Sequence, residues 1–509
     1  MNPSTSRPHV VIVGGGIAGL AAAFFLRDEP VRVTVLEGSP RLGGKLSVSE
    51  IAGVPVDEGA EALLVTRPEG TGLIAEVGLA GDRVAPGTTS SAIWTLGALH
   101  PLPRRQFMGV PSDLAELARS GTVSGQGVAR AGQDLELPPT MRDGDVPVAD
   151  FVGARFGPEV VDRLVDPLLG GVYAGRSSDL SFDATMPALA AASRRYRSLA
   201  EAVGSLLPPP APVPAGERDR APAGPWSGGS VFTTLAGGLG QLPAFLAKAS
   251  GAEVRTTAMT RALSPAPGAR GAPDAAGAPG ARPGWRLTVG SAAAADELID
   301  ADAVILAVPA RPAARLLAGV PGTSAAVTAF SEISYASMAI VTLAYPRSAF
   351  PGAGLAALGW SGYLVPAVDG RAVKAVTFSS VKWPHLAEVT APGAEPLEIV
   401  RCSVGRIGEE ALVQRADEDL AAVAAAELAA ATGVHGAPAA HRITRWGGAL
   451  PQYTVGHLDR VARIRAAVAT QPGLAVCGAA YEGVGIPACV ATARAAASQV
   501  TEFLRGGRQ

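Results

Sequence analysis

The stretch Val10-Val-Ile-Val-Gly14-Gly15-Gly16-Ile17-Ala18-Gly19 decides the fold of this 509-residue chain. Its β-branched run predicts a buried parallel strand. The glycines then complete the pattern G-x-G-x-x-G. Gly14 permits a tight turn, Gly16 lets the backbone approach a pyrophosphate, and Gly19 lets the next helix pack against the strand. We expect that helix over residues 18–27, with its positive end toward the phosphates.

A second strand, Val31–Leu36, ends at Glu37. That carboxylate stands 21 residues after Gly16, where an acidic residue binds a ribose hydroxyl in such motifs. Strand, glycines, helix, strand and acid in this order predict a nucleotide-binding βαβ unit. The uncharged run Val10–Leu26 also fits a membrane span or a signal-peptide core. Its three successive glycines weaken a helix, however, and it is short for a span.

Composition narrows the classes of function further. A chain of this length is expected to form two or more subdomains with sizeable cores. The net charge of −2 argues against binding of nucleic acid or another polyanion. Three widely spaced cysteines and six scattered histidines show no metal-ligand spacing. We therefore predict a cytoplasmic protein without a metal site.

Three further stretches carry a family resemblance. They are Arg41-Leu-Gly-Gly-Lys45, Asp57-Glu-Gly-Ala-Glu61 and Cys477-Gly-Ala-Ala-Tyr-Glu-Gly-Val-Gly-Ile486. Together with the glycine-rich stretch at Val10–Gly19, they resemble the superfamily of flavin-containing amine oxidases and protoporphyrinogen oxidases. Members of that superfamily carry the pattern R-x-G-G-[RK] where this chain has Arg41–Lys45. The resemblance implies an α/β and α+β fold. A discontinuous Rossmann-like FAD-binding domain is interleaved with a sheet substrate domain and a helical subdomain.

The resemblance also implies the FAD contacts. The diphosphate, ribose, adenine, flavin ring and pyrimidine edge would be held by Gly14, Gly15, Gly16, Ile17, Ala18, Gly19, Glu37, Gly38, Arg41, Gly44, Lys45, Gly59, Ala60, Glu61, Ala62, Val254, Trp446, Gly483, Val484, Gly485 and Ile486. Ordinary core packing is the alternative for Trp446. A thioether from Cys489 to the flavin is an alternative to a plain buried thiol.

The expected organisation follows from the same likeness and from composition. Residues 1–90, 231–311 and 446–509 would form the FAD-binding domain in three parts. Residues 91–207 read as a helical subdomain that faces substrate or membrane, and 312–445 as the substrate-binding domain. Residues 208–230 are Pro/Gly-rich and predict a surface loop, as does the biased stretch 265–284.

Four stretches narrow the choice within the superfamily. They are Leu99–Pro103 with Met108–Pro111, Pro167–Gly175, Lys382–His385 and Trp446–His457. Together they resemble the bacterial oxygen-dependent oxidases of haem biosynthesis. Gram-positive members act on coproporphyrinogen III, and relatives elsewhere act on protoporphyrinogen IX. Ser91 stands where the plant and animal protoporphyrinogen enzymes have a propionate-binding arginine, which favours coproporphyrinogen III.

That resemblance implies three two-electron oxidations by FAD, with O₂ as acceptor and H₂O₂ as product. No side chain would act as a catalytic residue, because the flavin carries the chemistry. Arg67 and Lys382 are the predicted substrate-binding residues. Arg104, Arg105, Arg194 and Arg195 are weaker candidates, for which a solvated surface is an equal reading. The resemblance also raises delivery of product to a ferrochelatase and, at most, peripheral contact with the cell membrane.

Three alternatives stay open. The first is a protoporphyrinogen IX oxidase. The second is an FAD amine oxidase or carotenoid desaturase. Tyr481 could form one wall of an amine oxidase's aromatic cage, but none of Lys248, Lys374 and Lys382 matches its lysine. The third is a flavin-binding protein that is not an enzyme.

Overall fold

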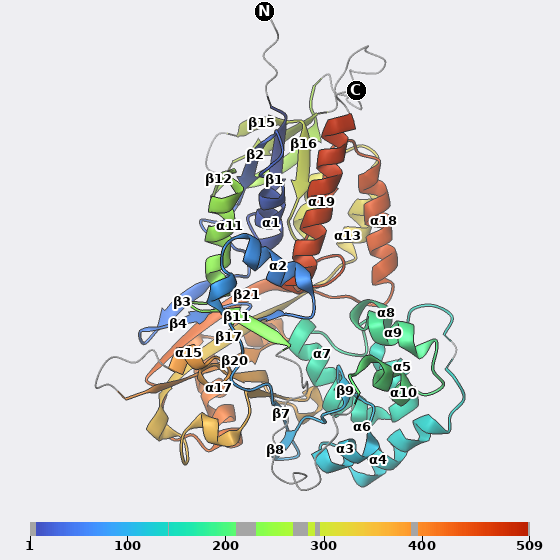
Figure 1. Cartoon of the computed structure of the whole chain (residues 1–509), viewed down its shortest axis with the longest axis vertical. Helices are drawn as coiled ribbons and strands as arrows, with labels where there is room; N and C mark the ends of the chain where they lie inside the picture. The colour runs from blue at the N-terminus through green and yellow to red at the C-terminus, as the bar shows by residue number, and fades with distance from the viewer. Residues whose placement is uncertain are drawn as a thin grey trace, which may run out of the picture.

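A parallel five-stranded sheet brings together segments from the start, middle and end of the chain (Figure 1). Its strands, in spatial order, are β12 (Glu253–Arg255), β2 (Arg32–Leu36), β1 (His9–Val13), β16 (Ala303–Leu306) and β22 (Leu474–Val476). All four pairings are parallel. The computed structural model describes residues 7–140, 142–209, 231–267, 284–290, 296–387 and 395–506. Most of the two predicted Pro/Gly-rich loops lies outside these residues.

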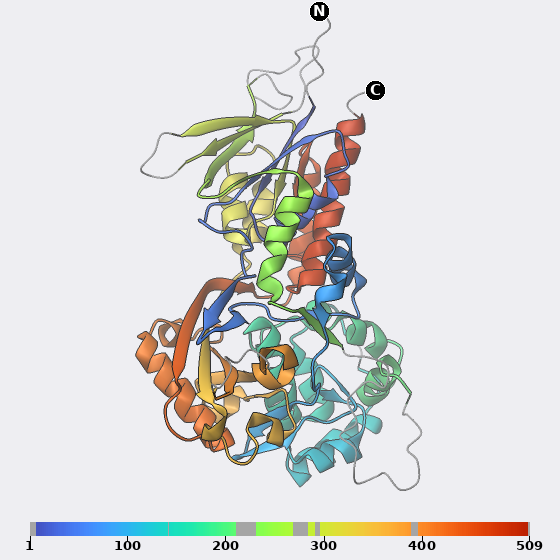
Figure 2. The same cartoon turned by 60° about the vertical axis from the view of Figure 1, so that its left-hand side comes forward.

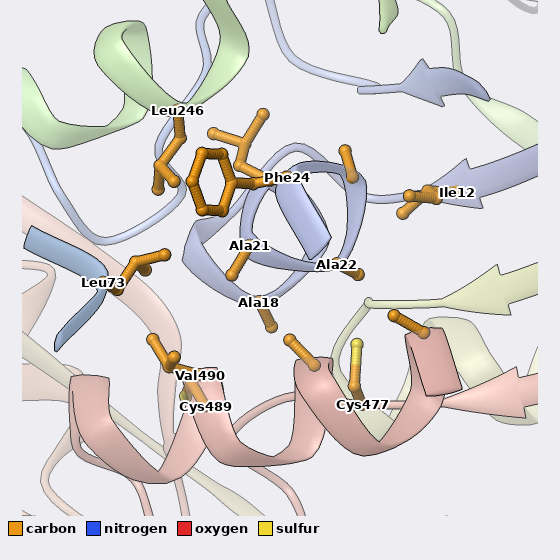
Figure 3. Packing of buried hydrophobic residues seen from close by; sticks show 14 of the residues in the cluster. Ile12, Ala18, Ala21, Ala22, Phe24, Leu73, Leu246, Cys477, Cys489 and Val490 are labelled. Carbon is orange, nitrogen blue, oxygen red and sulfur yellow. The ribbon is translucent and has the colours of Figure 1, made fainter. Parts of the chain in front are cut away.

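Both faces of this sheet are buried, as the β-branched run in β1 predicts. Val10 and Ile12 belong to one hydrophobic cluster, and Val11 and Val13 to another, because alternate side chains point to opposite faces. The first face packs on α1 (Ile17–Phe25), α2 (Pro68–Glu76), α11 (Leu242–Ser250) and α19 (Ile486–Gly506). Figure 3 shows α1 enclosed by these helices, with Ala18 toward Cys489 and Val490 of α19.

The second face of the sheet packs on elements from the middle of the chain. They are the antiparallel sheet β13 (Thr260–Pro265), β14 (Trp285–Val289) and β15 (Glu297–Ala301), and helices α12 (Ala310–Leu317), α13 (Ser324–Ser331) and α18 (His457–Ala469). Strands β13 and β14 pair antiparallel on either side of the biased stretch 265–284.

The other half of the molecule contains a seven-stranded mixed sheet. Its order is β21 (Ala440–Pro451), β17 (Tyr335–Pro346), β20 (Leu397–Val404), β19 (Val373–Phe378), β18 (Gly362–Leu364), β7 (Ala92–Thr95) and β8 (Ala98–Pro101). Helix α17 (Asp417–Thr432) covers one face, where Leu420, Ala424 and Leu428 pack on the strands. Figure 2 shows this sheet beside the helical part and below the five-stranded sheet.

Short helices make up the remaining layer, with their own core. They are α3 (Leu114–Ser120), α4 (Gly125–Gly132), α5 (Val148–Phe156), α6 (Pro158–Val160), α7 (Asp166–Tyr173), α8 (Phe182–Thr185), α9 (Pro187–Ser193) and α10 (Leu199–Leu206), with a π-helical turn over Val161–Val165. Small strands bridge the halves: β3 (Val48–Ile51) with β4 (Val54–Asp57), and β5 (Leu63–Leu64) with β11 (Phe232–Leu235) and β6 (Arg83–Val84).

The predicted fold class is confirmed, with differences at the end of one helix and at two segment boundaries. The first nucleotide-binding helix ends at Phe25 rather than residue 27. The segment 91–207 starts with strands instead of helix, because Leu96 and Gly97 both have positive φ and close a tight hairpin between β7 and β8. At the other boundary, β21 runs past residue 446 within the seven-stranded sheet. The division into six segments stays a prediction.

A membrane span is not seen in the described part of the chain: none of its helices combines the length and the apolar character that crossing a bilayer requires.

Gly19 tests the close packing of α1. A Cβ there would overlap the carbonyl oxygen of Gly14, so the helix would have to move from the turn. We expect Gly19→Ala to lower the free energy of unfolding by about 1–3 kcal/mol, as overpacking does. Denaturant titration measures it. Gly204→Ala, in α10, is the matched control, because no described atom lies within 4 Å of its Cβ position. Equal stability of the two variants would contradict the packing argument.

Candidate FAD site

The turn after β1 is shaped for an anionic group. Gly14 has φ +110°, and a Cβ there would lie 2.5 Å from the carbonyl oxygen of Ala307. Gly16 differs, because no described atom lies within 4 Å of its Cβ position. Helix α1 starts after Gly16 without a side-chain cap and without an acidic residue in its first turn. Its first N–H groups therefore remain available for a diphosphate, as predicted for Gly14–Gly19.

Glu37 lies at the end of β2, beside this turn. Its carboxylate accepts hydrogen bonds from the backbone N–H groups of Gly15 and Ser39, each at 2.7 Å. Its own N–H donates to the carbonyl of Arg255 at 2.8 Å, next to Val254 in β12. Gly38 packs against Met259, whose terminal methyl carbon would be 2.5 Å from an added Cβ. These bonds hold Glu37, Gly38 and Val254 together at one edge of the sheet, and their contacts with ribose and adenine stay a prediction.

The two basic residues of the Arg41–Lys45 loop behave differently. Arg41 donates to the carbonyl of Gly44 at 2.8 Å, and its guanidinium lies 5.6 Å from the ring centroid of Trp446. Lys45 makes no hydrogen bond or ion pair with any described residue, and burial lowers its pKa. Arg41 thus has partners within the protein, whereas Lys45 has none among the described residues. A bound anion would therefore stabilise the ammonium of Lys45.

The start and the end of the chain meet at Lys45. Its ammonium is close enough to Cys489, in the first turn of α19, for each group to influence the pKa of the other. Burial raises the pKa of the Cys489 thiol to about 11, against the smaller effect of Lys45. A thiol in this environment is mostly protonated and weakly nucleophilic. A covalent flavin link stays untested.

The loop Gly59–Ala62 lies against both Lys45 and Trp446. A Cβ on Gly59 would overlap the Lys45 carbonyl and lie 3.1 Å from the Trp446 ring. Ala60 N–H donates to the Lys45 carbonyl at 3.2 Å, and Trp446 Nε1–H donates to the Glu58 carbonyl at 3.0 Å. The predicted flavin-facing residues of three distant segments are therefore in contact.

Glu61 connects this loop to the seven-stranded sheet. Its carboxylate binds Lys382 Nζ at 2.9 Å and also pairs with Arg401, which donates to the Gly59 carbonyl at 2.6 Å. Burial opposes ionisation of Glu61, but the two cations outweigh it and lower its pKa to about 2. The charge of Lys382 is thus already paired within the protein, and its predicted role toward substrate stays untested.

Gly483–Ile486 forms the other side of the site. Gly483 N–H donates to the Tyr453 hydroxyl at 2.8 Å, and that hydroxyl donates to the Ala479 carbonyl at 2.7 Å. The Tyr453 ring stacks on His457 with centroids 3.8 Å apart. Tyr453 is a positioning residue that the sequence reasoning missed. Its only signal was its place in the stretch Trp446–His457.

Arg67 lies beside the same loop. One of its guanidinium nitrogens is 3.7 Å from the Cβ position of Gly483, and its side chain is 44% exposed. Its ion-pair partner, Glu69, is 3.8 Å away, a loose contact for a charged pair. Arg194, by contrast, is 61% exposed on the helical part and pairs with Asp183. Arg67 thus lies at the Gly483 loop, and Glu69 pairs only loosely with its charge.

Gly16→Ala tests the open space at the turn. We expect FAD affinity to fall about tenfold or more, since a lost ~1.4 kcal/mol corresponds to that factor. The apoprotein should melt as the wild type does, because the added methyl meets no described atom. Titration of apoprotein with FAD, followed by flavin fluorescence, measures the affinity. Wild-type affinity in this variant would place the diphosphate elsewhere.

Glu61→Gln tests the charged connection. It leaves Lys382 and Arg401 without their shared anion, and we expect a loss of about 3–5 kcal/mol at pH 7. Because folding lowers the pKa of Glu61, its stabilising effect is complete above the ordinary value and disappears as pH falls toward 2. The gap between variant and wild type should therefore narrow below about pH 4.5. Urea titrations between pH 7 and pH 3.5 measure this.

Glu76→Gln is the control for that series. Glu76 pairs with Arg494 at 3.1 Å on the surface, with both side chains well exposed. Its loss should cost about 0–1 kcal/mol. A similar effect from both substitutions would show that burial gives Glu61 no special weight.

Known proteins resemble the chain over nearly its full length. The coproporphyrinogen III oxidase of Mycobacterium tuberculosis is 37% identical over 506 residues, which cover 97% of each chain. The protoporphyrinogen oxidase of Macaca fascicularis is 31% identical, over 96% of this chain and 98% of its own. A crystal structure of a putative protoporphyrinogen oxidase from Exiguobacterium sp. 255-15 superposes with a TM-score of 0.79 at 28% identity, covering 98% and 99% of the two chains. The model for flavin containing amine oxidoreductases matches residues 17–501. The chain therefore belongs to the flavin containing amine oxidoreductase family, and FAD is its cofactor.

Proposed function

We propose that this protein oxidises coproporphyrinogen III to coproporphyrin III in haem biosynthesis. Each substrate molecule loses six electrons and six protons in three two-electron steps, and three O₂ become three H₂O₂. The observation that carries the proposal is the likeness to the mycobacterial coproporphyrinogen III oxidase, which extends over both ends of the FAD site.

When bound, FAD supplies the acceptor for two electrons in each step and returns them to O₂. The chain's own residues position the reactants. The backbone of Gly14–Gly19 holds the diphosphate, and Lys45 with the N-terminus of α19 stabilises negative charge on the cofactor. The pyrrole N–H proton leaves to solvent, so the proposal needs no acid or base side chain.

Substrate carboxylates supply the recognition. Coproporphyrinogen III has four propionates and protoporphyrinogen IX has two, so basic side chains at the site can discriminate between them. Arg67, beside the Gly483 loop, would bind one propionate. Ser91, just before β7, stands where the animal and plant protoporphyrinogen enzymes have arginine, and this supports the four-propionate substrate. Lys382 would contribute as part of its cluster with Arg401 and Glu61, in which one negative charge faces two positive charges.

Two expectations about the cellular setting belong to the same proposal. Coproporphyrin III would pass to a ferrochelatase, since a metal-inserting enzyme must consume a free porphyrin. The protein would act in the cytoplasm, with at most peripheral contact with the inner face of the cell membrane.

Porphyrin fluorescence tests the reaction directly. Purified holoenzyme is mixed in air with coproporphyrinogen III or with protoporphyrinogen IX, and fluorescence growth gives kcat/KM for each. We expect coproporphyrinogen III to be favoured about tenfold or more, as a single carboxylate contact of ~1.4 kcal/mol would give. A preference for protoporphyrinogen IX would show that protoporphyrinogen IX, and not coproporphyrinogen III, is the substrate. If neither compound were oxidised, the proposed function would be wrong.

Arg67→Ala tests the predicted propionate contact. We expect KM for coproporphyrinogen III to rise about tenfold with little change in kcat, because a binding contact common to ground and transition states is lost. Steady-state fluorescence assays measure both constants. Arg119→Ala is the control, because that guanidinium is 63% exposed on α3. An unchanged KM in the Arg67 variant would remove this residue from the substrate site.

A further inference from the structure

Lys374 is a buried lysine without a carboxylate partner among the described residues. It lies in β19 with 2% of its surface exposed, and its Nζ donates to the Ser403 hydroxyl at 2.7 Å. An ammonium has three N–H donors, and this is the one hydrogen bond that Nζ makes with the described part of the chain. A buried charge with so little compensation is costly unless an anion joins it.

The neighbouring charges do not supply that anion. Arg406 is also buried and donates to the Val365 carbonyl at 3.0 Å. The carboxylate near it, Glu409, accepts the Arg406 N–H at 3.0 Å and pairs with Arg176 at 3.3 Å. Burial, reinforced by Arg406, lowers the pKa of Lys374 to about 7. A carboxylate at Nζ would raise it again.

The Lys374 ammonium lies on the face of the seven-stranded sheet that also contacts the predicted flavin-facing loop. Ser403 is two residues from Arg401 in β20, so both side chains point to one face, about 7 Å apart. Arg401 donates to the Gly59 carbonyl in the flavin-facing loop. The opposite face of these strands, with Cys402 and Val404, packs under α17. One continuous face thus leads from the flavin loop to Ser403 and Lys374.

Solvent reaches this face beside Ser403. Helix α7 packs against β18 and β19, yet its Gly171 and Val172 are exposed, Val172 to 41%. Leu364, whose side chain lies 3.4 Å from the Cβ position of Gly171, is half-buried, and so is Ser403. A group that reaches the Ser403 hydroxyl therefore lies within one hydrogen bond of the Lys374 ammonium.

We propose that Lys374, together with Ser403, binds a propionate carboxylate of the tetrapyrrole substrate, an inference that rests on the proposed function. A carboxylate accepts two hydrogen bonds at each oxygen, so it can accept from the free N–H groups of Lys374 and from the serine hydroxyl. It also supplies the anion that Lys374 lacks among the described residues, since Glu409 already pairs with the Arg406 guanidinium at 3.7 Å. Lys374 is thereby a second specificity residue, on the sheet, in addition to Arg67 at the flavin-edge loop.

The test compares Lys374→Met and Lys374→Arg with wild-type holoenzyme. Methionine keeps the length of the side chain and removes the charge, and arginine restores a cation. We expect Lys374→Met to raise KM for coproporphyrinogen III about tenfold or more, with kcat within about threefold, and Lys374→Arg to recover at least part of the affinity. Titration with the product, coproporphyrin III, should give the same loss in Kd. Lys248→Met, on the exposed side of α11, should change none of these values.

The outcomes separate this inference from the function itself. If wild type turns over coproporphyrinogen III and Lys374→Met retains its KM and its Kd for coproporphyrin III, Lys374 does not bind substrate. Should Lys374→Met lose FAD or fail to fold, the Ser403→Ala holoenzyme decides: an unchanged KM and an unchanged Kd for coproporphyrin III in that variant overturn the inference. Absence of turnover by wild type would remove the proposed function, and this inference with it.

Discussion

A single buried carboxylate joins the two halves of the molecule. Glu61 extends from the loop beside the five-stranded sheet and shares its charge between Arg401, in β20 of the seven-stranded sheet, and Lys382, in the short helix Ser379–Lys382 that follows β19. Each of these ions would be costly to bury alone, so the three are stable only together. Arg401 also holds the Gly59 carbonyl, and Gly59 touches Lys45 and Trp446. The position of the predicted flavin-facing loop relative to the seven-stranded sheet therefore depends on this ion cluster.

The nucleotide-binding half could be predicted from the sequence because its signals are local. The positive φ of Gly14 and the contact of Gly19 with the Gly14 carbonyl belong to one short turn, and the β1–α1–β2 unit follows from them. The fold class and the cofactor are confirmed for the same reason. The segment 91–207, which was expected to be mostly helical, begins with the hairpin of β7 and β8, because Leu96 and Gly97 close a tight turn.

The substrate half depends on contacts that no local pattern reveals. The sequence did not distinguish the roles of Arg41 and Lys45. In the structure, Lys45 is buried without a partner among the described residues, whereas the guanidinium of Arg41 lies over the indole ring of Trp446. In the sequence, nothing distinguishes Lys374 from the other three lysines. Only the pairing of β19 with β20 places it beside Ser403. Tyr453 and Gly483, thirty residues apart, form a hydrogen bond only through the tertiary fold. Sequence can name such residues but cannot assign their partners.

The order of strands in the five-stranded sheet has a consequence for biosynthesis of the protein. β1 emerges from the ribosome first, but its neighbour β16 follows about three hundred residues later, and β22 with α19 comes near the end. The side of the FAD site formed by Gly483–Ile486 therefore does not exist until most of the chain has been made. A nascent chain must keep the apolar surfaces of β1 and α1 from aggregating in the meantime, and such long-range pairing is slow. Cofactor capture thus belongs to the last stage of folding, when it can stabilise the completed sheet by mass action.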